Sequence, residues 1–216
     1  MIFRNRTEAG RKLAQALKKL ESLHDRRDVL VLAIPRGGVV LGAEVARELG
    51  VPLDVWLARK IGAPGNPEFA IGSLSVNGEL VLDAATIHTL GITRTYIEAE
   101  TQRQAGELAR RMLLFRGHAE PVKVRGKTVV LVDDGIATGS TALSALAALK
   151  HAGAAKRILA APVAPLEGLP RMQAAADETV ILHASSAFAA VGQFYEEFAQ
   201  VPDEEVVRLL AAARNA

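Results

Sequence analysis

Residues 129–141 read VVLVDDGIATGST, and this stretch decides the fold. Four apolar residues in succession, 129–132, predict a strand that is buried on both faces. The glycine and hydroxyl residues of 135–141 predict a short loop, and the sequence after it predicts a helix that runs to about His151. A buried strand, a short loop and a helix in this order are the repeating unit of a parallel α/β sheet.

Comparable units lie on both sides of this stretch. The apolar run 29–34 (VLVLAI) predicts another strand, and the turn 35–38 (PRGG) leads from it into a helical pattern over 39–49. Further strands are expected at 53–58, 158–163 and 180–182. The alternation predicts a doubly wound, mostly parallel sheet with helices on both faces.

Three further features complete the expected architecture. Asn77-Gly78 stands between two short apolar runs and predicts a β-hairpin inserted near the middle of the sheet. Threonine caps predict helices over 7–23 and 93–115, and the residues after Pro202 predict a short amphipathic helix. The stretch 59–72 is rich in glycine and proline, so we expect a mobile loop there.

The composition is that of one ordinary globular domain. With 216 residues, half of them apolar, the chain is long enough to bury a substantial core, which we place at about 25–183. A net charge of only +2 argues against a dedicated nucleic-acid or membrane-surface binder. The absence of cysteine excludes disulfides, thiolate metal sites and cysteine nucleophiles. No secretory signal or transmembrane run is visible, so we expect a cytoplasmic protein.

Residues 133–141 combine an anion cradle with an acidic pair. Backbone N–H groups of 138–141 would lie at the positive end of a helix dipole, in a loop sized for one phosphate. Asp133 and Asp134 would repel that phosphate, but they suit a hydroxylated or metal-bound group, such as a ribose diol with Mg²⁺. The plainer reading is a turn begun by Asp133 and a helix capped by Thr138. The complete pattern in its strand–loop–helix context favours a sugar-phosphate site.

The same stretch resembles the phosphoribosyl-pyrophosphate (PRPP) signature of the type I phosphoribosyltransferases, and the chain resembles an uncharacterised branch of that family. The resemblance implies a sheet of the kind described above and catalytic roles for Asp133 and Asp134, which would bind the ribose hydroxyls. It further implies that five residues hold the 5′-phosphate of PRPP: Ala137, Thr138, Gly139, Ser140 and Thr141.

The turn after the first strand fits the same resemblance. Arg36, Gly37 and Gly38 resemble the family's pyrophosphate loop, whose backbone amides, often freed by a cis peptide bond, face the leaving group. Glycine lets the backbone approach a charged ligand closely, and an arginine can add positive charge. Alone, the segment would equally suit an ordinary strand-to-helix turn with a surface arginine.

Two other regions are assigned by position in the family. Arg59 and Lys60 lie where the family has a flexible lid whose basic residues reach the pyrophosphate; two solvated charges on a surface loop are the alternative. The acceptor would lie under a small hood built from the chain ends, 1–24 and 184–216. Phe194 and Tyr195 could stack on a base there, although such a pair more often belongs to a core or an interface.

The implied activity is transfer of the 5-phosphoribosyl group from PRPP to a nitrogenous base or amine, with Mg²⁺ as cofactor and pyrophosphate as product. The acceptor is not identified by the sequence. The family likeness makes a homodimer one option, and we expect neither nucleic-acid nor membrane partners. Two alternatives stay open: a PRPP-binding regulator that has lost catalysis, and a sugar-phosphate hydrolase on a similar sheet.

Other ligand-binding motifs are missing. Gly37 and Gly42 have the spacing of a P-loop, but Ala43 stands where its lysine belongs. Neither the dinucleotide motif G-x-G-x-x-G nor the hydrolase motif G-x-S-x-G occurs. The five histidines are scattered and form no i, i+4 pair, which argues against a histidine metal site.

Overall fold

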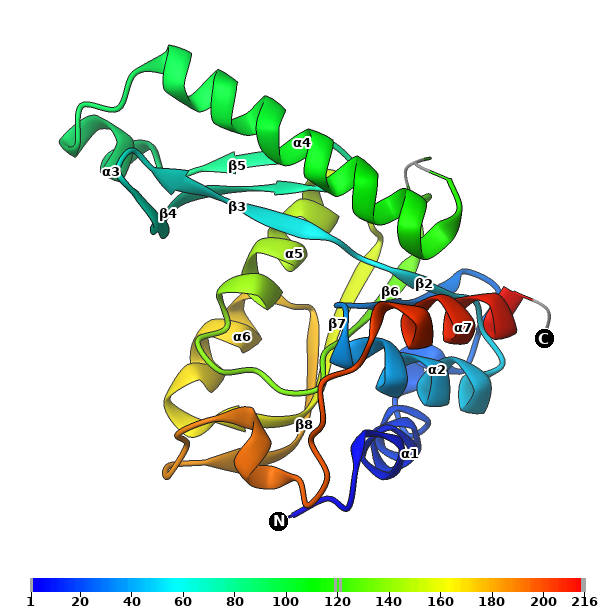
Figure 1. Ribbon diagram of the computed structural model, residues 1–216. Coiled ribbons are helices and arrows are strands. Elements are labelled where there is room, and N and C mark those ends of the chain that lie inside the picture. Colours follow the sequence, from blue (N-terminus) through cyan, green and yellow to red (C-terminus); the bar gives the residue numbers. More distant parts are fainter. Residues whose placement is uncertain (1, 119, 121, 215–216) are drawn as a thin grey trace.

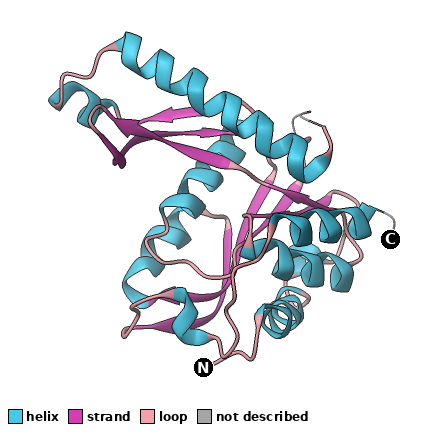
Figure 2. Ribbon diagram, in the orientation of Figure 1, coloured by secondary structure: helices cyan, strands magenta, loops and turns pink. Residues whose placement is uncertain are grey.

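The computed structural model describes residues 2–118, 120 and 122–214. Its main body is a five-stranded sheet in the order β2-β1-β6-β7-β8, and every pairing in it is parallel. The strands are β1 (Val29–Ala33), β2 (Leu53–Val55), β6 (Thr128–Val132), β7 (Lys156–Pro165) and β8 (Glu178–Ser185). The predicted doubly wound α/β class is confirmed (Figure 2).

Helices cover both faces of this sheet (Figure 1). On one face, α2 (Gly37–Leu49) connects β1 to β2 and packs beside α1 (Arg6–Leu17). On the other face, α5 (Ser140–His151) and α6 (Leu169–Ala175) make the connections from β6 to β7 and from β7 to β8. The chain therefore winds in opposite directions from β1 and from β6, which are neighbours at the centre.

A separate antiparallel sheet stands at one end of the molecule (Figure 1). It consists of β3 (Ala58–Ala63), β4 (Asn66–Ser75) and β5 (Leu80–Leu82). The short helix α3 (Ala84–Thr89) follows, and α4 (Arg94–Arg116) runs along β3. The hairpin predicted at Asn77-Gly78 joins β4 to β5, with Gly78 at a φ of +81°. The hairpin is inserted in the chain between β2 and β6, as predicted, but it does not join the main sheet, because β3 pairs with β4 and completes a second sheet.

The mobile loop predicted at 59–72 is also wrong, since these residues form β3 and β4. Glycine serves close packing here rather than flexibility. A Cβ on Gly62 would lie 2.7 Å from the Cα of Pro67, and one on Gly72 would lie 2.5 Å from the carbonyl oxygen of Val81. The strand predicted at 53–58 accordingly divides, with its first half in β2 and its last residue in β3.

The N-terminal segment pairs with residues 194–197. Phe3 forms a parallel bridge with Tyr195, and the backbone N–H of Phe3 donates to Phe194 O at 2.8 Å. The expected C-terminal helix is α7 (Asp203–Arg214), which packs on α2 and α4. The N-terminal helix starts earlier than predicted and stops sooner: Asn5 caps it by accepting from the N–H of Glu8 at 3.0 Å, and it ends at Leu17.

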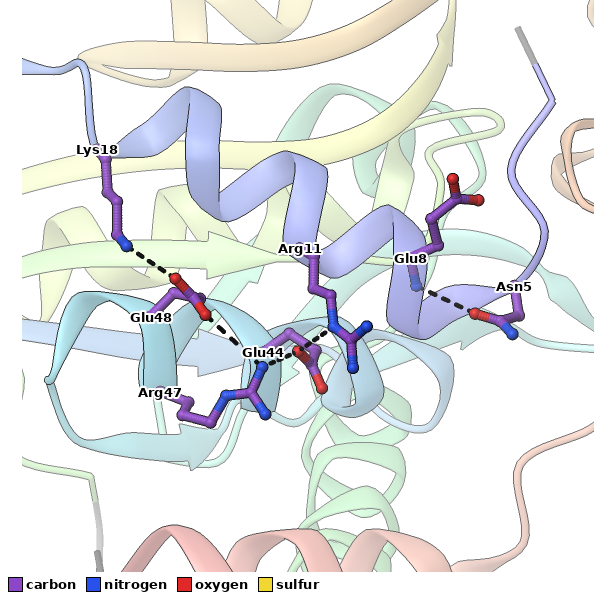
Figure 3. Close-up of polar contacts among 7 residues, drawn as sticks. All are labelled: Asn5, Glu8, Arg11, Lys18, Glu44, Arg47 and Glu48. Carbon is purple, nitrogen blue, oxygen red and sulfur yellow. Dashed lines mark hydrogen bonds and ion pairs between the residues drawn. The ribbon is translucent and has the colours of Figure 1, made fainter.

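Ion pairs line the outer edge of the contact between α1 and α2 (Figure 3). Arg11 Nε lies 3.1 Å from Glu44 Oε2, and Lys18 Nζ lies 2.8 Å from Glu48 Oε2. Exposed pairs of this kind contribute at most about 1 kcal/mol each. The contact depends on the buried residues beneath them and on Gly10, where a Cβ would come within 3.0 Å of Leu41 Cα.

Among the described residues, no helix combines the length and the apolar character needed to cross a bilayer. The core is centred on β6, where Val129 to Val132 are completely buried, as predicted for residues 129–132.

Truncation of the central strand tests this picture. Leu131→Ala should lower the free energy of unfolding by about 2–5 kcal/mol, because it leaves a cavity between two helical layers. Leu113→Ala on α4 is the matched control, since Leu113 is 54% exposed, and it should change stability by less than about 0.5 kcal/mol. Urea unfolding measures both. Equal losses in the two variants would contradict the burial described here.

Candidate functional site

The candidate site lies at the carboxyl ends of β1 and β6. In open α/β sheets, ligands bind where the strand order reverses, because the loops of neighbouring strands turn to opposite faces and leave a crevice. The N–H of Ile34 donates to Val132 O at 2.9 Å, so the two strands stay paired up to their last residues. The turn 35–38 and the loop 133–139 then leave from adjacent points.

The two loops touch through glycine. A Cβ on Gly37 would lie 1.8 Å from Oδ2 of Asp134, and a Cβ on Gly38 would lie 2.8 Å from Val132 O. Only glycine permits this approach. The Pro35–Arg36 peptide bond is cis, as the family likeness implied. The structure therefore brings the predicted pyrophosphate loop and the predicted acidic pair together.

The acidic pair is held by its own backbone and by its surroundings. Oδ1 of Asp133 accepts from the N–H of Asp134 at 2.9 Å. Withdrawal from water raises the pKa of the Asp133 carboxyl well above its ordinary value, and the neighbouring charge of Asp134 raises it further. Oδ2 of Asp134 accepts from Nε of Arg6 at 2.7 Å. One carboxylate is thus neutralised by an arginine from the first helix, and the other is costly to ionise.

Residues 137–141 form the loop expected to cradle a phosphate. Gly139 has a φ of +78° and is the N-cap of α5, so the plainer expectation that Thr138 caps this helix is wrong. Within the described residues no side chain caps the helix; Ser140 N donates to Thr138 Oγ1 over 3.4 Å, and the hydroxyls of Thr138 and Ser140 lie 3.1 Å apart. Thr138, Ser140 and Thr141 are exposed and surround the positive end of the dipole.

The C-terminal segment crosses beside the acidic pair, which the sequence did not reveal. The hydroxyl of Tyr195 donates to the carbonyl oxygen of Asp134 at 2.5 Å. The guanidinium of Arg6 lies 3.8 Å from the ring centroid of Phe198 and donates through Nη1 to Ala199 O at 2.7 Å. Arg6 and Asp134 are 128 positions apart, and a lone arginine near a chain end gives no signal of such a contact.

Phe194 and Tyr195 are both buried. Phe194 lies edge-on to the ring of His183 at 5.5 Å between centroids, and Tyr195 stacks on Phe198 at 4.9 Å. Burial also raises the pKa of the Tyr195 phenol, so the hydroxyl is a hydrogen-bond donor. Stacking of these rings on an acceptor base stays a prediction.

The other basic residues predicted for the site lie further out. Arg36 keeps about a third of its side chain exposed and lies 3.6 Å from Asp203, the first residue of α7. Arg59 donates through Nε to Gln104 of α4 at 2.8 Å, and Lys60 pairs with Glu68 across the hairpin at 2.6 Å. Within the described residues, no hydrogen bond or ion pair links Arg59 or Lys60 to the two loops.

The donor set suits Mg²⁺ only if a ligand completes it. The described residues contain no group of three or more acidic or histidine side chains that could hold a metal ion by themselves. Mg²⁺ is commonly bound by one or two carboxylates together with substrate phosphates. Asp133 and Asp134 fit a cation that arrives with a phosphorylated ligand.

A parallel sheet with a glycine turn, an acidic pair and an exposed helix N-terminus at its switch point has the geometry of a site for a phosphorylated ligand. The chain matches the family described as "Phosphoribosyl transferase domain" over residues 4–197, and it belongs to that family.

Relatives agree with this assignment. Two Mycobacterium tuberculosis proteins, each provisionally named a phosphoribosyl transferase, are 40% identical over 99% of this chain and 47% of their own length. The chain thus spans about half the length of the curated relatives it matches. A crystal structure from Thermus thermophilus is 43% identical, with a TM-score of 0.85 over 98% of this chain and 99% of that one. An Aquifex aeolicus protein, 14% identical with a TM-score of 0.50 over 83% and 74%, shares the fold.

Gly135 tests the contact between the site loop and the C-terminal segment. A Cβ there would lie 2.3 Å from Cγ1 of Val191, so Gly135→Ala should cost about 1–3 kcal/mol in urea unfolding. Adding Val191→Ala should recover part of the loss, because Cγ2 of Val163 would still lie 2.9 Å from the new Cβ. Gly106→Ala is the control, because nothing lies within 4 Å of its Cβ position. A double variant no more stable than Gly135→Ala would refute the clash.

The partly buried carboxyl of Asp133 predicts a gain in stability on substitution. Because its pKa is higher in the folded state than in the unfolded chain, ionisation at pH 7 disfavours folding. Asp133→Asn should therefore raise Tm at pH 7, on the order of 3 °C, and the gain should shrink as the pH falls toward the ordinary range of aspartate.

Thermal melts between pH 4 and 8 measure this difference. Asp25→Asn is the matched control: Arg27 lowers the pKa of this exposed carboxyl to about 2, so its replacement should bring no gain at pH 7. A gain at Asp133 that stays constant over the whole pH range would show that ionisation is not its cause.

Proposed function

We propose that this chain is a phosphoribosyltransferase that moves the 5-phosphoribosyl group from PRPP to a nitrogenous base or amine and releases pyrophosphate. The observation that carries the proposal is the contact between Gly37 and Asp134. It sets the proposed pyrophosphate turn against a carboxylate proposed to bind the ribose, and the loop that carries this carboxylate continues into the N-terminus of α5 at Ser140.

Each part of PRPP has a matching part of the site in this proposal. The 5′-phosphate binds the N–H groups of 137–141, and the pyrophosphate binds the turn formed by Arg36, Gly37 and Gly38. The ribose hydroxyls donate to Asp133 and Asp134. When bound with PRPP, Mg²⁺ would offset negative charge on the pyrophosphate, with one of these carboxylates as a protein ligand.

The chain's own groups stabilise the charges that develop on the ribose and on the leaving group, and they orient the reactants. The bond between C1 of the ribose and the pyrophosphate oxygen breaks, positive charge develops on the ribose, and the acceptor nitrogen then forms its bond to C1. The two carboxylates lie on the ribose side and offset that positive charge, while backbone N–H groups of the PRGG turn stabilise the departing anion. No covalent nucleophile is required, because binding orients the reactants.

The remaining assignments belong to the same proposal. Residues 1–24 and 184–216 form the hood over the acceptor, and Phe194 and Tyr195 of this hood stack on it. Arg59 and Lys60 belong to a lid that excludes water. The proposal includes a cytoplasmic location.

Calorimetric titration of PRPP, with and without Mg²⁺, tests the proposal, followed by pyrophosphate release in the presence of a panel of nucleobases and amines. We expect Mg²⁺-dependent binding and release with one acceptor. Asp134→Asn keeps an oxygen for Arg6 but removes the charge, and it should weaken PRPP binding about tenfold or more. Asp25→Asn should bind PRPP as the wild type does.

Each other result points elsewhere. PRPP binding without turnover on any acceptor would indicate a regulator that has kept the ligand and lost the chemistry. Release of orthophosphate would indicate a hydrolase. No binding of PRPP under either condition would refute the assignment of the loops.

A further inference from the structure

Arg6 lies at the point where the two ligand loops meet, although it belongs to the first helix. Its Nε is 2.7 Å from Oδ2 of Asp134. The same nitrogen would be 2.8 Å from a Cβ placed on Gly37. One guanidinium therefore borders both the acidic pair and the PRGG turn.

The guanidinium is fixed on several sides. Its face lies 3.8 Å from the ring centroid of Phe198, and Nη1 donates to Ala199 O at 2.7 Å. Only 12% of the Arg6 side chain and 16% of the Asp134 side chain are exposed. An arginine with a stacked plane and directed hydrogen bonds holds its partner in one orientation, which a flexible surface pair does not do.

Arg6 engages only one oxygen of its partner carboxylate. It occupies Oδ2, whereas Oδ1 of Asp134 accepts no hydrogen bond within the described part of the chain.

We propose that Arg6 is a positioning residue for ribose recognition: it holds Asp134 so that the free oxygen, Oδ1, accepts a hydroxyl of a ribose phosphate. This inference rests on the proposed function, because it presumes that Asp134 binds the ribose. Arg6 acts through Asp134 and makes no contact with the pyrophosphate. The N-terminal helix and the 198–199 segment thereby tune the affinity of a site built from β1 and β6.

Two partial ligands separate this role from the alternatives. Ribose 5-phosphate carries the hydroxyls and the 5′-phosphate, whereas inorganic pyrophosphate carries neither. Arg6→Gln should weaken the binding of ribose 5-phosphate and PRPP about tenfold and change the binding of pyrophosphate less than about twofold. Arg6→Lys retains the charge but loses the planar fork, so it should weaken ribose 5-phosphate and PRPP binding about threefold to tenfold and leave pyrophosphate binding nearly unchanged.

The control is Arg11→Gln on the same helix, because Arg11 is exposed and pairs with Glu44 on the side of α1 that contacts α2 (Figure 3). It should bind every ligand as the wild type does. Thermal melts of each variant verify folding. If Arg6→Gln does not fold, Phe198→Leu replaces it, since loss of the ring frees the guanidinium without changing any charge, and it should weaken ribose 5-phosphate about threefold.

The outcomes distinguish the two proposals. A wild type that binds neither PRPP nor ribose 5-phosphate overturns the proposed function and this inference with it. If the wild type binds, equal affinities in the Arg6 and Arg11 variants overturn the positioning role alone. A loss of pyrophosphate affinity as large as that for ribose 5-phosphate overturns it too, because it would make Arg6 a direct ligand of the leaving group.

Discussion

The parallel pairing of β1 with β6 is the constraint on which the site depends. Its register runs from Val29 opposite Thr128 to Ala33 opposite Val132, so the two strands end side by side. Because the connections from these strands lead to opposite faces, the loops diverge and leave a crevice between them. A slip of one residue in this register would move the PRGG turn relative to the acidic pair and turn each strand's side chains over.

Within that crevice the fold carries a carboxyl whose ionisation costs stability. Two adjacent carboxyls are brought out of water, and the pKa of one of them is raised by burial. Strained or poorly solvated groups persist in folded proteins when the surroundings hold them, and they concentrate at functional sites. Here the surroundings are the glycines of the PRGG turn, the Arg6 guanidinium and the hydroxyl of Tyr195.

Two segments from opposite parts of the chain border the candidate site. Residues 3–4 pair with 194–197, and that pairing places Arg6 of α1 against Phe198 and Asp134. The same C-terminal segment continues to Asp203, which lies near Arg36 of the PRGG turn. Arg6 of α1 and Arg36 of the PRGG turn therefore both contact the segment 198–203.

The sequence by itself determined those strands, turns and loops whose signals lie in neighbouring residues. The apolar runs 29–34 and 129–132 predict the central strands, and Asn77-Gly78 predicts a turn. The acidic pair and the small residues of 133–141, placed after a strand and before a helix, predict an anion-binding loop. Such features depend on the backbone preferences and hydrophobicity of neighbouring residues. The tertiary structure alone decided that glycines at 62 and 72 build a second sheet instead of a loop, and that Arg6 joins Asp134 across 128 positions. Contacts of that kind arise from the packing of distant elements, and no pattern among adjacent residues encodes them.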